Sequence, residues 1–276
     1  EGFTMYLERL IIGELYGEHE RAVHAFVGYN DLKHTIAELK DQSKLTALCA
    51  NLEGMDPDDA FSRIPYEKGF LMLLCLEDLV GGKDKMVAWL QAYFRDFQRQ
   101  SIDADQMQAH FTAHFPSISF DWTLWRDGFG LPDWSPFNYF DTATYDGYKA
   151  HADRIVKEEG KNCAAGDVTS PSQMMCLLDF LILHHSPMAP ATLTAMDAAY
   201  QLSSTANPEF MVRWVSLLLD AHHPSALEVC SRFVGSCGRG VYMRTAYRKM
   251  IDAANSGKAA FRLDAVKAVW QKNRPA

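Results

Sequence analysis

Apolar residues recur at helical spacing along nearly the whole chain, and this periodicity restricts its fold more than any other feature. Near the N-terminus the apolar side chains fall three or four positions apart, at Phe3, Tyr6, Leu7, Leu10, Ile11 and Leu15. Such spacing gathers apolar side chains on one face of an α-helix, whereas the alternation typical of half-buried strands is scarce. The sequence therefore predicts an all-α protein.

The segment from Pro65 to Val80 is apolar around most of its helical circumference. This pattern predicts a helix that is buried on several sides. The pair Gly81-Gly82 ends that helix, and further helices are expected from Lys83 to Phe97 and from Ser101 to Phe115.

The composition changes between Phe115 and Gly147, where proline, glycine and aromatic residues accumulate. This texture indicates an ordered linker held by large side chains. Helical patterning resumes at Thr144, and short breaks then separate helices of ordinary length, as in stacked helix pairs. We predict a helical lobe over residues 1–128, a linker over 129–143, and an armadillo/HEAT-like α-α superhelix over 144–276.

The charge balance excludes some classes of partner. The 276 residues carry a formal net charge of -8, which gives no basic surface for nucleic acid or an anionic membrane. The apolar runs are shorter than a bilayer span, and no signal-peptide pattern opens the chain. We expect a soluble, cytoplasmic protein that binds neither nucleic acid nor membrane; the composition says nothing about its oligomeric state.

Several short motifs follow one another in a specific order. They are Glu-Gly-x-Thr-x-Tyr-Leu-Glu-Arg at 1–9, Asp-Pro-Asp at 56–58, Pro-Tyr-Glu-Lys-Gly at 65–69, Gly-Leu-Pro at 130–132, and Gly-Arg with a second arginine at 238–244. Taken together, this series resembles the gluzincin zinc aminopeptidases, and is most similar to their leukotriene-A(4) hydrolase and aminopeptidase B branch.

The resemblance implies a fold and an activity for the parent protein. Residues 1–128 would be the helical lobe of a thermolysin-like catalytic domain, and the superhelix would close one side of its cleft. The parent would be a zinc aminopeptidase that acts on peptides with a free N-terminus, where metal-bound water attacks the first peptide bond.

The resemblance also implies roles for five residues. Glu1 would be a zinc ligand, Tyr66 would stabilise the oxyanion, and Asp58 would line the pocket for the N-terminal residue of the substrate. Arg239 would hold the free carboxylate of the substrate, because a planar guanidinium can bond both oxygens. Glu8 would orient a metal ligand from behind. Without the resemblance, Tyr66 would be interpreted as an aromatic residue near a helix start, and Glu1 as a solvated chain terminus.

The other three residues also have structural interpretations. The run Asp-Pro-Asp-Asp at 56–59 has the pattern of a capped helix start, in which Asp58 faces the positive end of the helix dipole. Arg239 could be an ordinary surface cation, and Glu8 could pair with Arg9 or Arg21.

The sequence also departs from the family pattern. It lacks the His-Glu-x-x-His motif that supplies two zinc ligands and the general base. We therefore predict that the inferred function belongs to a longer parent, and that this fragment by itself holds no tightly bound zinc and cleaves no peptides. The alternative is a catalytically inactive helical scaffold that binds protein partners.

Two further departures concern the lipid substrate. Phe61 stands where leukotriene-A(4) hydrolases carry a second tyrosine, and Val241 stands where they carry a cation. The site thereby loses one hydroxyl and one charge. Peptide cleavage is therefore a firmer expectation than hydrolysis of a lipid epoxide.

Overall fold

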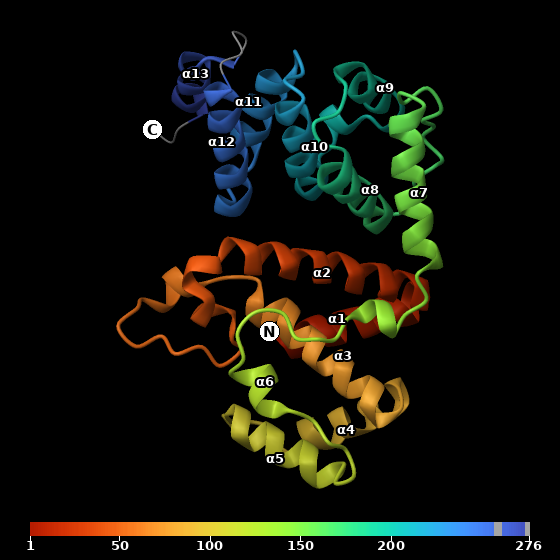
Figure 1. Ribbon diagram of the computed structural model, residues 1–276, viewed down its shortest axis with the longest axis vertical. Coiled ribbons are helices and arrows are strands. Elements are labelled where there is room, and N and C mark those ends of the chain that lie inside the picture. Colours follow the sequence, from red (N-terminus) through yellow and green to blue (C-terminus); the bar gives the residue numbers. More distant parts are fainter. Residues whose placement is uncertain (257–260, 274–276) are drawn as a thin grey trace. The chain divides into compact units, whose positions relative to one another are not determined.

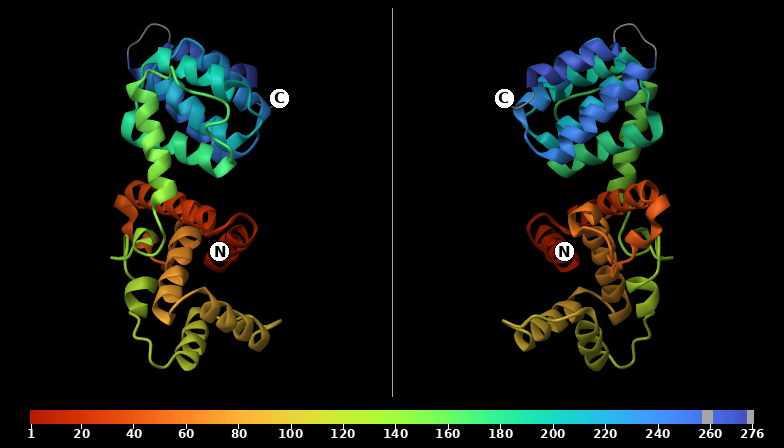
Figure 2. Two further views of the ribbon diagram at one scale, coloured as in Figure 1. Left: turned by 90° about the vertical axis from the view of Figure 1, so that its right-hand side faces the viewer. Right: turned by 90° about the vertical axis from the view of Figure 1, so that its left-hand side faces the viewer.

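The computed structural model describes residues 1–256 and 261–273. Within these ranges every regular element is a helix and none is a strand, so the prediction of an all-α fold is confirmed (Figure 1). The chain forms two compact units, Glu1–Thr142 and Ala143–Ala276, and Figure 2 gives two further views. None of the described helices combines the length and the apolar character needed to cross a membrane.

The first unit opens with a helical hairpin. Helix α1 (Gly2–Tyr16) and helix α2 (Glu18–Glu38) pack against each other. They are joined at Gly17, whose φ of 98° is a conformation that favours glycine. Less regular chain follows, with the short helices η1 (Lys40–Thr46) and η2 (Pro57–Ala60).

Helix α3 (Gly69–Val80) lies at the centre of the first unit, where it packs against α1 and α4. It continues directly from η3 (Ile64–Lys68), a π-helical turn. Gly81 ends it in the left-handed conformation, with a φ of 90°. The buried helix predicted between residues 65 and 80 is therefore present, with a π-helical first turn.

The rest of the first unit is held by aromatic packing. Its helices are α4 (Lys83–Asp96), α5 (Ala104–His114), α6 (Trp122–Arg126) and η4 (Pro136–Asn138). Helix α5 begins with a capping box, in which the side chain of Asp103 accepts from the backbone N–H of Gln106 at 2.9 Å. The rings of Trp89 and Phe111 meet edge to face, with centroids 5.0 Å apart.

Large side chains fix residues 129–142 to the first unit. The ring of Phe137 stacks on that of Phe26 from α2, with centroids 4.3 Å apart. The hydroxyl of Tyr139 donates to Glu77 of α3 at 2.5 Å. These contacts make the segment an ordered part of the unit.

The second unit is a stack of helices. Its elements are α7 (Ala143–Lys157), α8 (Pro171–His185), α9 (Pro190–Tyr200), η5 (Leu202–Ser204), α10 (Pro208–Asp220), α11 (Ala226–Ser236), α12 (Gly240–Asn255) and α13 (Leu263–Asn273). Helix α10 packs against α8, α11 and α12, and contributes the fully buried Trp214. Helix α13 packs against both α11 and α12. This serial stacking is the predicted superhelical arrangement.

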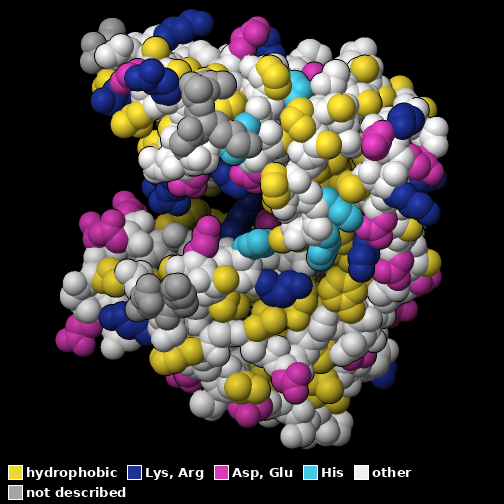
Figure 3. All heavy atoms as spheres, turned by 45° about the horizontal axis from the view of Figure 1, so that its top comes forward, with side chains coloured by type: hydrophobic (Ala, Val, Ile, Leu, Met, Phe, Trp, Pro, Cys, Tyr) yellow, Lys and Arg dark blue, Asp and Glu magenta, His cyan; other side chains and the backbone are white. Residues whose placement is uncertain are grey.

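One face of the molecule carries mixed charge. On the face shown in Figure 3, Lys and Arg side chains are interspersed with Asp and Glu. This distribution agrees with the modest negative net charge of the sequence.

Candidate active site

A cavity of about 300 Å³ lies in the first unit. Glu1 and Tyr66, the two residues predicted at the reaction centre, both contribute to its wall. Most of the other lining residues are apolar: Leu45, Ala47, Leu48, Ala50, Leu52, Pro57, Ala60, Phe61, Ile64 and Pro65, together with Ser62. The cavity therefore offers a carboxylate and a phenol in a largely apolar setting.

Two glycines explain why these side chains converge. A Cβ atom added to Gly2 would lie 2.6 Å from the carbonyl carbon of Gly69, and one added to Gly69 would lie 2.8 Å from the Cα of Gly2. Such distances are too short for any larger residue, so the first turns of α1 and α3 meet backbone to backbone. Glu1 precedes Gly2, and Tyr66 lies three positions before Gly69. The contact therefore brings both to the same cavity.

Tyr66 lies on η3 and is half-buried. Its ring meets that of Phe61 edge to face, with centroids 6.1 Å apart, and Phe61 is itself 77% exposed. Within the described ranges, the Tyr66 hydroxyl makes no hydrogen bond. Glu1 is exposed, and its side chain does not cap α1. Both polar groups are thus available to a ligand.

A buried ion pair supports the turn that carries Tyr66. Nη2 of Arg9 donates to both carboxylate oxygens of Glu67, at 3.0 and 2.8 Å, and the two side chains are only 4% and 3% exposed. The guanidinium also lies 4.0 Å from the ring centre of Phe70. Burial raises the pKa of Glu67, and the charge of Arg9 opposes that rise. Gly28 of α2 makes room, since a Cβ there would lie 2.1 Å from Oε2 of Glu67.

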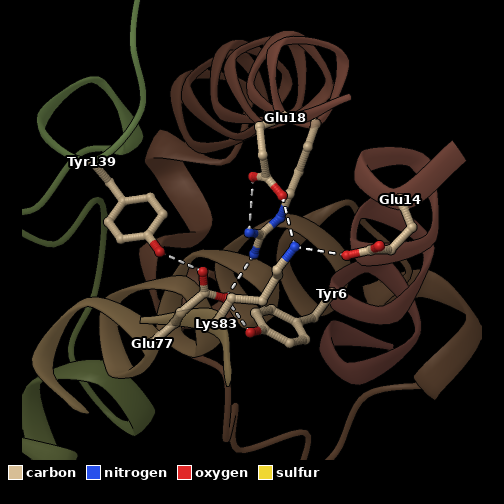
Figure 4. Close-up of polar contacts among 7 residues, drawn as sticks. Tyr6, Glu14, Glu18, Glu77, Lys83 and Tyr139 are labelled. Atoms are coloured by element: carbon tan, nitrogen blue, oxygen red, sulfur yellow. Dashed lines mark hydrogen bonds and ion pairs between the residues drawn. The ribbon is translucent and has the colours of Figure 1, made fainter. Parts of the chain in front are cut away.

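A second buried carboxylate, Glu77, connects four parts of the unit (Figure 4). It accepts hydrogen bonds from the hydroxyls of Tyr6 and Tyr139 and from Nη2 of Arg21, the last at 2.6 Å. Burial, reinforced by Glu77, raises the pKa of both phenols. The network extends outward through Glu18, Lys83 and Glu14. It therefore joins α1, α2, α3 and the segment after η4.

Lys68 is a further buried charge, and it is 1% exposed. Its Nζ donates to the carbonyl oxygens of Thr46 and Gly128, each at 2.8 Å. Burial lowers the pKa of Lys68 to about 8. The hydroxyl oxygen of Thr46 accepts in turn from the N–H of Gly130 at 2.7 Å. Lys68 thus ties one wall of the cavity to the segment around residue 129.

The predicted roles of Asp58 and Glu8 stay predictions. Asp56 caps η2 by accepting from the backbone N–H of Asp58 at 3.0 Å. The Asp58 side chain is exposed and is not part of the cavity wall. Glu8 is exposed on α1. The alternative that Glu8 pairs with Arg9 or Arg21 is wrong, because these cations pair with Glu67 and with Glu18 and Glu77.

Arg239 belongs to the second unit, where it is exposed at the start of α12. Its Nη1 donates to the hydroxyl of Tyr242 at 3.2 Å, and that hydroxyl donates to Glu209 at 2.5 Å. These contacts orient the guanidinium. Its predicted role as a carboxylate clamp stays a prediction.

The described residues do not form a zinc site by themselves. No group of three or more His, Cys, Asp or Glu side chains among them is arranged to hold a metal ion. A catalytic zinc ordinarily takes three protein ligands and leaves one position for water or substrate. Glu1 can supply one such ligand.

Known proteins match both units. The chain is 33% identical over 262 residues to "Leucine aminopeptidase 2" of Ajellomyces capsulatus, which covers 91% of this chain and 41% of that protein. It is also 33% identical over 263 residues to "Leukotriene A-4 hydrolase homolog" of Botryotinia fuckeliana, covering 91% and 40%. The solved structure of native yeast LTA4 hydrolase superimposes with a TM-score of 0.82 at 27% identity, over 99% of this chain and 46% of that one.

Two family profiles match in the order that the motifs suggested. Residues 1–120 match the "Peptidase family M1 domain", and residues 169–274 match "Leukotriene A4 hydrolase, C-terminal". The chain belongs to the M1 peptidase family. It corresponds to the C-terminal portion of a protein of the leukotriene A4 hydrolase type, and spans about two fifths of the length of the curated relatives. The resemblance inferred from the motifs is confirmed.

The buried charges that support the Tyr66 turn and its surroundings were not predicted from the sequence. Glu67, Lys68 and Glu77 are buried charged positions in a mostly apolar segment, whose remaining charged residue, Asp78, is exposed. A buried charge requires a partner, so each of these residues could have been predicted to pair with a polar group elsewhere in the chain. Their partners lie between 22 and 71 positions away along the chain, beyond the reach of any local pattern.

Proposed function

We propose that this chain forms one wall of the active site of a metallo-aminopeptidase that removes N-terminal residues from peptides. The observation that carries the proposal is the cavity that Glu1 and Tyr66 share. Membership of the M1 family supports it, as does the likeness to proteins named leucine aminopeptidase. Activity, substrates and partners are proposed for the complete protein.

Tyr66 would donate a hydrogen bond to the oxyanion of the attacked peptide bond. Its hydroxyl has no competing partner among the described residues, and the surrounding wall is mostly apolar. A preorganised donor is worth more in such a setting than in water, because the low local dielectric strengthens its interaction with developing negative charge.

Glu1 would contribute one carboxylate to a zinc ion in the complete protein. The remaining ligands and the general base would come from residues outside this sequence. Asp58 would read the N-terminal residue of the substrate, Arg239 its free carboxylate, and Glu8 would orient a metal ligand. These three roles rest on the motifs alone.

We place peptides ahead of lipid epoxides as substrates. Phe61 lies against the ring of Tyr66 and has no hydroxyl to offer a second polar contact. Val241, 52% exposed on α12, has no charge.

The complete protein is expected to hydrolyse amino-acid amides whose α-amino group is free, and to leave the N-acetylated equivalents intact. Prior treatment with a strong chelator should abolish this activity, and added zinc should restore it, because M1 chemistry needs a metal. The measurement is initial rate with matched leucyl and N-acetyl-leucyl substrates. A properly folded complete protein that hydrolyses neither would favour the scaffold alternative.

The 276-residue chain alone is expected to bind no stoichiometric zinc. One carboxylate lacks the ligand number that tight zinc binding requires. The check is metal analysis after equilibration with micromolar zinc and gel filtration. One retained zinc ion per chain would contradict the ligand assignment, and a Glu1→Gln variant would show whether that carboxylate is involved.

A further inference from the structure

We propose that Lys68 is a positioning residue that holds the wall formed by residues 45–52 in place against Tyr66. Only the expected effect of Lys68 on enzyme kinetics rests on the proposed function. Its structural consequence can be tested on this chain alone.

The wall supplies a large share of the cavity but has little regular structure. Its lining residues are Leu45, Ala47, Leu48, Ala50 and Leu52. Helix η1 ends at Thr46, and no helix resumes until η2 begins at Pro57. Such a segment depends on contacts with other parts of the chain for its position.

Lys68 provides that contact from the side of the catalytic tyrosine. It stands two positions after Tyr66 in the same π-helical turn. Its Nζ reaches the carbonyl of Thr46 inside the wall and that of Gly128 beyond it, both at 2.8 Å. One side chain therefore fixes the wall to the turn that carries the phenol.

Two hydrogen bonds from backbone N–H groups complete the attachment. The N–H of Gly130 donates to the hydroxyl oxygen of Thr46 at 2.7 Å, and the N–H of Cys49 donates to the carbonyl of Arg126 at 2.9 Å. The wall is thus held between the Lys68 ammonium and the segment 126–130. Without the ammonium, the carbonyl oxygens of Thr46 and Gly128 would each lose a charged donor, which weakens this attachment.

Hydrogen exchange on the 276-residue chain tests the structural part. Lys68→Met keeps most of the side-chain volume and removes the donors, so exchange at Cys49 and Gly130 should accelerate about tenfold or more, while α10 in the other unit should be unchanged. Lys44→Met is the matched control, because Lys44 is exposed and adjoins the same wall. Equal protection of Cys49 and Gly130 in the Lys68 variant would overturn the proposal.

Kinetics of the complete protein test the consequence for the substrate. With a leucyl substrate, Lys68→Met should raise KM about tenfold and change kcat by no more than about threefold, because the wall binds the substrate and takes no part in the chemistry. Thr46→Val, which removes the acceptor for Gly130, should shift KM in the same direction. A smaller active fraction with unchanged KM would indicate a merely structural role and reject positioning. If the unmodified protein has no activity, the proposed function fails while the exchange result still decides the role of Lys68.

Discussion

Replacing Tyr66 with phenylalanine in the complete protein should lower kcat about a hundred- to a thousandfold, the loss that follows removal of one oxyanion donor elsewhere. The substitution deletes one oxygen atom and leaves the ring that packs against Phe61. Because the hydroxyl makes no hydrogen bond within the described parts of the chain, folding should be unaffected. KM should change little, since the lost interaction would form mainly in the transition state.

The measurement is steady-state hydrolysis of a leucyl substrate, together with thermal unfolding. Tyr16→Phe is a suitable control, because Tyr16 lies on α1 with 66% of its surface exposed and does not line the cavity. It should retain normal turnover. A Tyr66→Phe protein with near-normal turnover would remove Tyr66 from the reaction and with it the basis of the proposed function.

Helical periodicity was sufficient to predict the fold class. The apolar segment at residues 65–80 became a buried helix, and the glycine at position 81 ended it as expected. These outcomes depend on local spacing and on the conformational freedom of glycine, which neighbouring residues in the sequence largely determine. The serial stacking of the second unit likewise follows from helices of ordinary length joined by short loops.

The fold brings only some of the predicted site residues together. Glu1 and Tyr66 share a cavity, but the contact that unites them is between the backbones of Gly2 and Gly69. Nothing in the sequence around either glycine identifies the other. Asp58 lies outside the wall, although its neighbour Pro57 lines it. Convergence of this kind depends on long-range packing, which local patterns do not encode.

The same reasoning explains why Glu8 does not pair with Arg9, one of the two cations named in the structural alternative for Glu8. Adjacent residues in a helix point in different directions, so Glu8 and Arg9 do not face each other. Glu8 faces solvent, while Arg9 turns inward to Glu67, 58 positions away. The proximity of opposite charges in a sequence is therefore weaker evidence than the helical face on which each one lies.

Arg9→Met should destabilise the first unit by about 3–5 kcal/mol at neutral pH, because it leaves the carboxylate of Glu67 buried without a counterion. The double variant Arg9→Met/Glu67→Met should recover most of that loss, since no charge then remains buried. Arg95→Met is a matched control, because Arg95 is exposed and, among the residues that the structure describes, pairs only with its neighbour Asp96. Its effect should stay below about 1 kcal/mol.

The loss caused by Arg9→Met should shrink as the pH falls. Burial already raises the pKa of Glu67, and removal of Arg9 takes away the charge that opposes the rise. Folding raises the pKa of such a carboxyl group. The stability that it contributes is fully present below its pKa in the unfolded chain, and is lost as the pH rises through its pKa in the folded protein. Between neutral pH and about pH 4.5, near the ordinary pKa of a glutamate, the variant should therefore approach the unmodified protein.

Native-state hydrogen exchange at the buried amides of α3 measures the free energy of unfolding of the first unit by itself. It therefore does not require the two units to unfold in a single transition. The relevant quantity is the difference between the variant and the unmodified chain at each pH, so that carboxylates common to both cancel. A difference that stayed constant from neutral pH to pH 4.5 would mean that Glu67 does not carry a buried charge. The ion pair would then not be what holds the Tyr66 turn against α1.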